Sequence, residues 1–135
     1  MTVDIGGIID LGEFPINIAK EQIGTSIIFS NLISSVTLNA RLAFGSGGMT
    51  VIGVVQTSLD QGTTWIDIAR FDFATTGLEK VMNLTNVAIT SPYTVIALAS
   101  EGSNNGILGD RLRAIVTSTG TYAGSTLLSI RAAVR

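Results

Sequence analysis

The sequence contains no cysteine and no histidine. Without cysteine the chain has no disulfide framework, no thiolate nucleophile and no cysteine-based zinc site. Without histidine it lacks the commonest general base and the commonest metal-ligating side chain, and a serine–histidine–aspartate triad is excluded. We therefore expect a protein that is not an enzyme, with no catalytic, cofactor-binding or metal-binding residues.

Charged residues are scarce as well. They make up 13% of the chain, about half of the ~25% found in ordinary soluble domains, whereas apolar residues make up 46%. A monomer with so few charges has little with which to cover its surface, so we expect part of that surface to be buried in a homo-oligomer. The alternative is a monomer coated with the abundant serine and threonine hydroxyls.

Nucleic acid and membrane partners are not expected. Binding to nucleic acid needs clustered lysine and arginine, and only Arg111 and Arg113 lie close together in a chain of net charge −2. No apolar run approaches the ~20 residues that cross a bilayer. The N-terminal residues lack the basic start and apolar core of a signal peptide, so we expect synthesis in the cytoplasm.

The order of apolar and polar residues predicts an all-β fold. Period-two alternation recurs along the chain, no stretch has sustained helical periodicity, and turns rich in glycine, asparagine, serine and threonine follow at regular spacing. This pattern is typical of a single-domain antiparallel β-sandwich, jelly-roll-like, with about eight strands. The predicted strands are 23–29, 36–44, 49–57, 65–73, 78–84, 93–99, 110–117 and 128–135.

Three of these segments carry specific expectations. Residues 93–99 form a continuous apolar run, which predicts a buried strand. In 23–29, Ile23, Thr25, Ile27 and Phe29 share one face. In 65–73 the apolar parity changes after Ala69, which indicates either a β-bulge near Ala69 and Arg70 or a strand covered on both faces. Parity alone places Asp67 and Asp72 on opposite faces.

The first twenty residues are less regular. Gly6, Gly7, Gly12 and Pro15 interrupt any strand pattern there. We expect residues 1–20 to form an N-terminal arm or irregular segment, and residues 21–135 to form the β-sandwich. The alternative is a strand-like segment that packs on its own domain.

The stretch between the strands 49–57 and 65–73 contains a tight sequence motif. Ser58, Asp60, Gly62, Thr64 and Trp65 fit the pattern S-x-D-x-G-x-T-W. The Asp60 carboxylate can accept backbone N–H groups that follow it, Gly62 can supply a positive φ, and Trp65 can cover the base of the hairpin. The pattern resembles the Asp-box hairpins of sialidases and other β-propellers, where it is structural, so we interpret it as a structural hairpin.

Acidic residues offer two other candidate sites. Glu101 and Asp110 flank a turn and could meet as the carboxylate pair of a glycosidase, although solvated loop acids are far commoner. Oxygen atoms of Asp60, Asp67 and the Asn104-Asn105 turn could hold calcium. No calcium-binding loop spacing is present, so we expect neither site.

The chain from residue 56 onwards resembles small virion structural proteins of tailed bacteriophages. The resemblance lies in QTSLDQGTTWIDIARFDF (56–73) and GDRLRAIVTSTGTYAGSTLLSIRAAVR (109–135), which includes TGTYAGSTL (119–127). Within that group the length fits a jelly-roll head decoration, or cement, protein. The resemblance implies a trimer on the capsid surface that binds the major capsid protein or other virion proteins. Alternatives are a tail, neck or fibre component, or a carbohydrate-binding β-sandwich.

Overall fold

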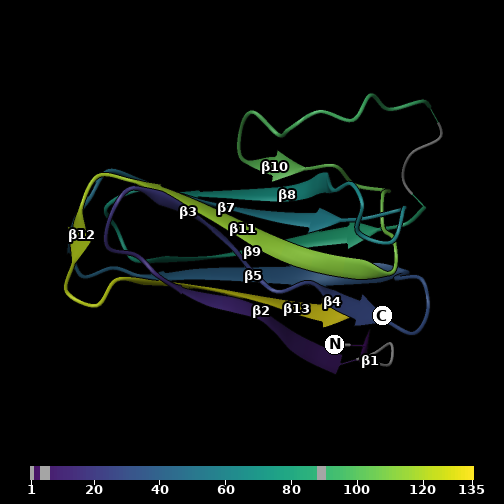
Figure 1. Ribbon diagram of the computed structural model, residues 1–135, viewed down its shortest axis with the longest axis horizontal. Coiled ribbons are helices and arrows are strands. Elements are labelled where there is room, and N and C mark those ends of the chain that lie inside the picture. Colours follow the sequence, from purple (N-terminus) through teal and green to yellow (C-terminus); the bar gives the residue numbers. More distant parts are fainter. Residues whose placement is uncertain (1, 4–6, 88–90) are drawn as a thin grey trace.

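The computed structural model describes residues 2, 3, 7–87 and 91–135, and these form two β-sheets stacked as layers (Figure 1). No helix in this part of the chain is long and apolar enough to cross a membrane. The larger sheet contains β1 (Thr2–Val3), β3 (Lys20–Ile23), β4 (Ile27–Phe29), β7 (Thr50–Thr57), β8 (Ile66–Phe73), β10 (Gly102–Ser103) and β11 (Arg111–Thr119). The smaller sheet contains β2 (Gly7–Pro15), β5 (Ser35–Ala43), β9 (Leu78–Thr85) and β13 (Leu127–Val134), and β6 (Ser46–Gly47) pairs separately with β12 (Tyr122–Ala123).

The strand pairing defines the topology. The first long strand, β2, pairs with the last, β13; β3 and β4 pair with β11; β5 pairs with β9; and β7 pairs with β8, all antiparallel. Leaving the two-residue strands aside, the first strand thus pairs with the last, the second with the second last, and so on towards the middle of the chain. This order is that of an eight-stranded jelly roll in which β3 and β4 together occupy one strand position. The predicted all-β, single-domain jelly-roll sandwich is confirmed.

The core lies between the two sheets. Because side chains alternate along a strand, one face of each long strand points inward. The inward residues are those that the alternation predicts: Val36, Leu38, Ala40 and Leu42 on β5, Leu112, Ala114 and Val116 on β11, and Leu128, Ile130, Ala132 and Val134 on β13. Phe71 of β8 also points inward, and it is the largest fully buried side chain in the described part of the chain.

Of the two alternatives for residues 65–73, the β-bulge is present in β8, at Ile68 and Ala69. Val55 of β7 pairs with Ala69 and the next residue, Gln56, pairs with Asp67, so Ile68 has no partner on β7. Ile68 and Ala69 are consecutive and both fully buried, which is the signature of an extra residue in one strand.

The bulge changes the faces of the residues that follow it. Asp67, Arg70 and Asp72 are all partly exposed, between buried neighbours, and so lie on the outer face of the larger sheet. The expectation that Asp67 and Asp72 point to opposite faces was therefore wrong, because the extra residue shifts the parity by one.

The N-terminal segment belongs to the sandwich over residues 7–15. There it forms β2, which pairs along its whole length with β13, and it buries Leu11 and Phe14 in the core. Gly12 is accommodated by a register shift opposite Ile130 and Arg131 and by a φ of +148°. Of the two alternatives for residues 1–20, the strand packed on its own domain describes 7–15, and the arm does not. Residues 1 and 4–6 lie outside the described part.

The prediction of a buried strand over 93–99 was wrong. These residues have no regular secondary structure, and Val95 and Ile96 are 57% and 63% exposed. The position beside β8 is occupied by β10, and the Asn104 N–H donates to the Ile68 carbonyl. The edge of β8 is therefore not open to the apolar run.

The predicted strand 23–29 is interrupted in the middle. β3 ends at Ile23 and β4 begins at Ile27, and Ile23 is 58% exposed although Ile27 and Phe29 are buried. At Gly24 a Cβ would lie 3.0 Å from the Leu11 carbonyl oxygen and 3.1 Å from that of Ala114. The chain passes too close to its neighbours there for the shared face to continue.

The packing of β2 predicts a stability difference between its two faces. Phe14→Ala should lower the free energy of unfolding by about 3–5 kcal/mol, because it removes a buried ring from the core. Ile8→Ala, at a position that is 77% exposed on the same strand, should change it by less than about 0.5 kcal/mol. Urea denaturation measures both. Equal, small effects would mean that this segment is a detached arm.

Candidate interaction surface

The motif residues form the turn between β7 and β8. Ser58 Oγ accepts the Gly62 N–H at 2.8 Å and lies 2.9 Å from Asp60 Oδ1. The Asp60 carboxylate accepts the Thr64 N–H at 2.8 Å and the Thr64 hydroxyl at 2.6 Å. Gly62 has a φ of +87°, which an L side chain rarely adopts. Side-chain bonds thus close the loop onto its own backbone.

The same hydrogen bonds stabilise the ionised form of Asp60. The donors, first the Thr64 hydroxyl, then the Thr64 N–H and the Ser58 hydroxyl, lower the pKa of Asp60 from 3.8 to about 2. Asp60 remains an exposed side chain on a turn. Among the described residues, no group of three histidine, cysteine, aspartate or glutamate side chains gathers here or elsewhere.

Trp65 begins a row of contacts on the outer face of the larger sheet. The Arg113 guanidinium carbon lies 4.3 Å from the centre of the Trp65 ring, a cation–π geometry. Arg113 Nε donates to Gln56 Oε1 at 2.8 Å, and Gln56 Nε2 donates to Asp67 Oδ1 at 2.7 Å. The row crosses β11, β7 and β8. Trp65 thus lies beneath an arginine instead of forming an open aromatic platform.

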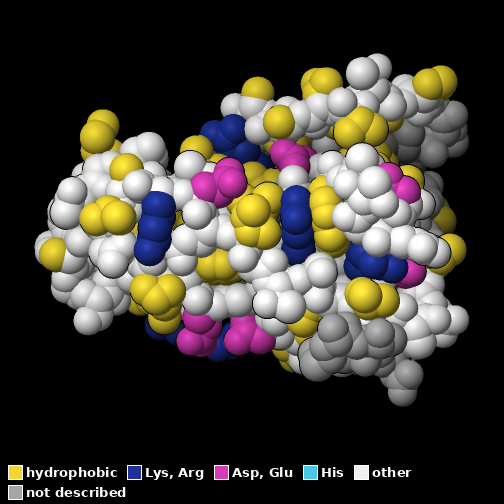
Figure 2. Space-filling view, viewed as in Figure 1, with side chains coloured by type: hydrophobic (Ala, Val, Ile, Leu, Met, Phe, Trp, Pro, Cys, Tyr) yellow, Lys and Arg dark blue, Asp and Glu magenta, His cyan; other side chains and the backbone are white. Residues whose placement is uncertain are grey.

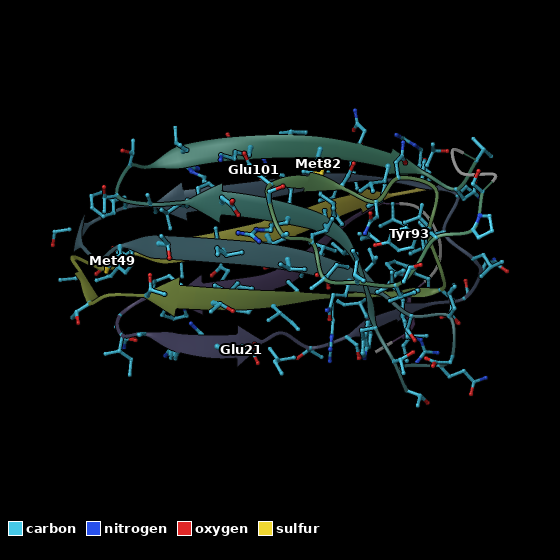
Figure 3. All side chains as sticks on the ribbon, turned by 90° about the horizontal axis from the view of Figure 1, so that it is seen from above. Glu21, Met49, Met82, Tyr93 and Glu101 are labelled. Atoms are coloured by element: carbon cyan, nitrogen blue, oxygen red, sulfur yellow. The ribbon has the colours of Figure 1, made fainter. Side chains whose placement is uncertain are left out.

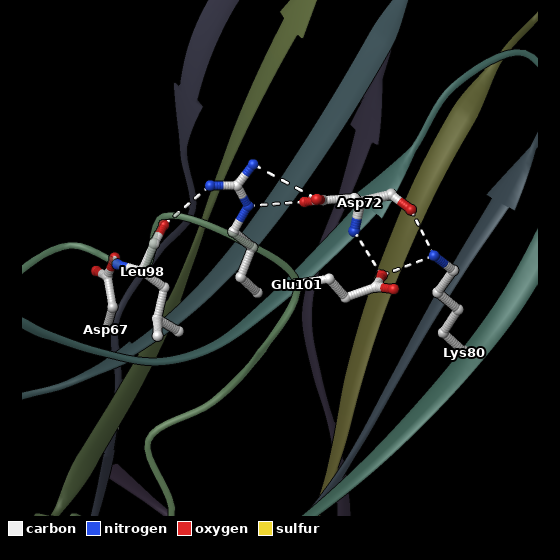
Figure 4. Close-up of polar contacts among 6 residues, drawn as sticks. Asp67, Asp72, Lys80, Leu98 and Glu101 are labelled. Carbon is white, nitrogen blue, oxygen red and sulfur yellow. Dashed lines mark hydrogen bonds and ion pairs between the residues drawn. The ribbon is translucent and has the colours of Figure 1, made fainter.

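The row continues into the 91–101 loop through both backbone groups of Leu98. Asp67 Oδ2 accepts the Leu98 N–H at 3.1 Å, and Arg70 Nη1 donates to the Leu98 carbonyl at 2.9 Å (Figure 4). Arg70 Nε also pairs with Asp72 Oδ1 at 2.7 Å. A strand would satisfy these backbone groups with other backbone groups, whereas here side chains of β8 do so.

A second set of contacts closes the edge of β8. Glu101 Oε2 accepts the Asp72 N–H at 2.8 Å and the Lys80 ammonium at 2.6 Å, and Lys80 also donates to the Asp72 carbonyl at 2.6 Å (Figure 4). The Lys80 hydrogen bond is the main cause of a lowered pKa at Glu101. We call Asp67, Arg70, Asp72, Lys80 and Glu101 the charged anchor.

The candidate carboxylate pair is not assembled in this arrangement. Glu101 belongs to the charged anchor, while Asp110 Oδ1 pairs with Arg111 Nε at 3.0 Å. Asp67 and Asn104 hold the loop through hydrogen bonds, since Asn104 Nδ2 donates to the Asp67 carbonyl and to the Tyr93 hydroxyl, each at 2.7 Å. These oxygen-bearing residues serve the structure of the loop.

Apolar side chains accompany the charged anchor on this face. Ile115 of β11 pairs with both Ile23 of β3 and Val54 of β7, which places an apolar row across three strands. Val95 and Ile96 are exposed on the loop. Figure 2, which views the two layers edge-on, shows hydrophobic side chains between separate basic and acidic groups on that side, with no large block of either charge. This surface was not predicted from the sequence, although the change of apolar parity after Ala69 indicated that residues from both parities of β8 reach one face.

No family model and no curated protein matches the chain. Among solved structures, a chain of Triatoma virus has a TM-score of 0.49 and 9% identity over 97% of this chain and 64% of its own length. A CBM4 structure has a TM-score of 0.48 and 7% identity over 97% of this chain and 80% of its own. Tripeptidyl peptidase 2 has a TM-score of 0.49 and 11% identity over 98% of this chain and 10% of its own. All three TM-scores lie below 0.5, and the fold is assigned from its strand order.

The tied turn predicts acid sensitivity. Because the pKa of Asp60 is lower in the folded chain than its ordinary 3.8, its contribution to stability is present above about pH 4 and is lost as the pH falls towards about 2. Asp60→Ala should lower the melting temperature at neutral pH and flatten its decline across this window. Thr63→Ala, which removes no hydrogen-bonding side chain of the turn, is the control. An unchanged melting temperature for Asp60→Ala would contradict the tied turn.

The charged anchor predicts a local change at β8. Lys80→Met keeps an apolar stem beside the Phe73 ring, which lies 5.0 Å from the ammonium, but removes the bonds to Glu101 and Asp72. Stability should fall by about 1 kcal/mol, and the Asp72 amide should exchange with solvent faster. Lys20→Met on the exposed β3 should alter neither quantity. Unchanged exchange at Asp72 in Lys80→Met would show that Glu101 is held by other groups.

Proposed function

We propose that this chain is a non-enzymatic structural protein of a bacteriophage virion, namely a head decoration protein that stabilises the capsid by binding the major capsid protein. The resemblance of residues 56 onwards to small phage virion proteins motivates the proposal. The low charge content agrees with a protein that buries part of its surface in an assembly. The acidic side chains of the charged anchor are engaged in holding the loop.

The observation that carries the proposal is the exposed apolar segment at Val95 and Ile96. An exposed segment of this kind is normally mobile and costs ordering entropy on binding. Here the adjacent Leu98 is fixed through its N–H and its carbonyl by Asp67 and Arg70, and Tyr93 is fixed by Asn104. A preorganised apolar loop suits attachment to a fixed neighbour such as a capsid shell.

The carbohydrate-binding alternative finds less support. Such modules bind sugars on exposed aromatic platforms. In the described chain Phe14, Phe29, Phe71, Phe73 and Tyr122 are buried, and Trp65 lies under Arg113. A tail, neck or fibre position would use the same loop, and labelling of intact particles separates that position from the head.

Attachment to the shell predicts a difference between the two ends of the molecule. Val95→Lys with Ile96→Lys should lower the affinity for capsids that lack the protein by at least about tenfold, because two charges would need desolvation in the contact. Met49→Lys, 64% exposed and at the opposite end from Tyr93 in Figure 3, is the control. Co-sedimentation with such capsids measures the binding.

The melting temperatures of both variants should match that of the parent, since all three positions are exposed. Equal binding by the double variant and the parent would remove the loop from the contact. Failure of the parent itself to bind any capsid would reject the decoration role.

A further inference from the structure

Among the described strands of more than two residues, the sheet edges are guarded, with one exception. An unguarded edge offers unpaired N–H and C=O groups to another chain. The edge of β8 is closed by β10, Glu101, Lys80 and Asn104. β2 carries two exposed acids, a bulge and a terminal proline, and β3 has four residues that include Lys20 and Glu21.

The exception is β9, an eight-residue edge strand whose ladder partner is β5. Seen from above, the strand that carries Met82 lies at the margin of the molecule, and no described element lies beyond it (Figure 3). It contains neither proline nor a bulge. Lys80, its cation, is neutralised within the chain by Glu101 at 2.6 Å, so pairing at this edge would not bury an unpaired charge.

Hydrogen-bond alternation shows which backbone groups of β9 face outward. Ser35 and Arg135 exchange both backbone hydrogen bonds, so Ser35 points to β13 and the following residue, Val36, points to β9. Val36 pairs with Leu84, and hence the alternate residues 79, 81, 83 and 85 direct N–H and C=O away from β5. The Thr85 N–H is indeed taken by Asn105 Oδ1, at 2.7 Å. Glu79, Val81 and Asn83 remain.

The side chains of Glu79 and Asn83 can pair with those of a second copy of the chain, because one has a free acceptor and the other a free donor. Thr37 Oγ1 donates to Asn83 Oδ1 at 2.8 Å, which leaves the Asn83 amide nitrogen as a donor to another chain. Asn39 Nδ2 donates to Glu79 Oε2 at 3.0 Å, which leaves Oε1 as an acceptor. Donor and acceptor lie two positions on either side of Val81, which is 62% exposed.

We propose that two copies of this chain associate through β9, antiparallel, about a two-fold axis at Val81. Val81 then exchanges backbone hydrogen bonds with its symmetry mate, and each Glu79 faces the Asn83 of the other copy in both backbone and side chain. The contact is isologous, as a two-fold requires. It joins the smaller sheets of the two copies into one continuous sheet. The number of strands in that sheet is within the usual range for proteins.

The other registers are disfavoured by the residues they oppose. A two-fold at Glu79 or at Lys80 sets like charges against each other. A two-fold at Met82 or at Asn83 requires the Thr85 N–H, which Asn105 already occupies. The register at Val81 opposes no like charges and needs no group that is bound within the chain.

A charge swap tests this register. Asn83→Asp keeps the acceptor for Thr37 but sets a carboxylate against Glu79 of the other copy at two symmetric places, so the dimer dissociation constant should rise by about tenfold. Adding Glu79→Gln keeps the acceptor for Asn39 and restores a donor opposite the new carboxylate, so the constant should return towards that of the parent. Sedimentation equilibrium of the full chain measures all three proteins.

A covalent test is possible because the chain has no cysteine. Val81→Cys should give a disulfide-linked dimer under mild oxidation, since residues paired across a two-fold lie within disulfide range. Ile8→Cys, at the exposed edge strand on the other side of the sheet, should not. A parent that sediments as a monomer at high concentration, or an Asn83→Asp variant that associates as the parent does, would overturn the proposal.

The β9 contact stands apart from the decoration role. A dimeric parent that fails to bind capsids would reject that role and leave the contact intact. A parent that binds capsids but is monomeric at every concentration would do the reverse. A trimer, as the resemblance implies, would use another surface, and its mass would not respond to Asn83→Asp.

Discussion

The bulge at Ile68 decides which side chains share the outer face of the larger sheet. Without the extra residue, Asp67 would point away from Arg70 and Asp72, and the row from Trp65 would end at Gln56. With it, Asp67 and Arg70 flank Leu98 and bind both of its backbone groups. One inserted residue therefore turns a strand edge into a support for a loop, a use of bulges seen where a side chain must be re-aimed.

Charge is used sparingly in this molecule, and much of it is structural. Lys80, Glu101, Asp72 and Arg70 close one edge of a sheet and fix a loop, while Asp60 ties a turn. With so few charges committed in this way, apolar groups remain at the surface on the 93–99 segment and on β9. In our account these two places are the contacts with other chains, the first with a different protein and the second with a copy of itself.

Alternation within strands made the sandwich predictable, because residues such as those of β5, β11 and β13 simply follow the pleat. The run 93–99 was wrongly predicted to be a buried strand because its apolar composition is that of a strand. The position beside β8 that it would have taken is filled by β10 and by side-chain hydrogen bonds from residues far away in sequence. For β2 the glycines indicated an irregular segment, whereas Gly12 in fact lies at a bulge within a strand. The Ser58–Asp60–Thr64 turn was predictable because its bonds are local, whereas the charged anchor joins β8, β9 and the 91–101 loop.

The most direct test of this account is the exchange rate of the Leu98 amide hydrogen. This residue lies in a segment without secondary structure, where amides normally exchange almost freely. If Asp67 and Arg70 hold it as described, the Leu98 amide should exchange at least about a hundredfold more slowly than the exposed amides beside it in the parent, and the protection should disappear in Asp67→Ala. Free exchange at Leu98 in the parent would contradict the account, because the loop would then not be preorganised.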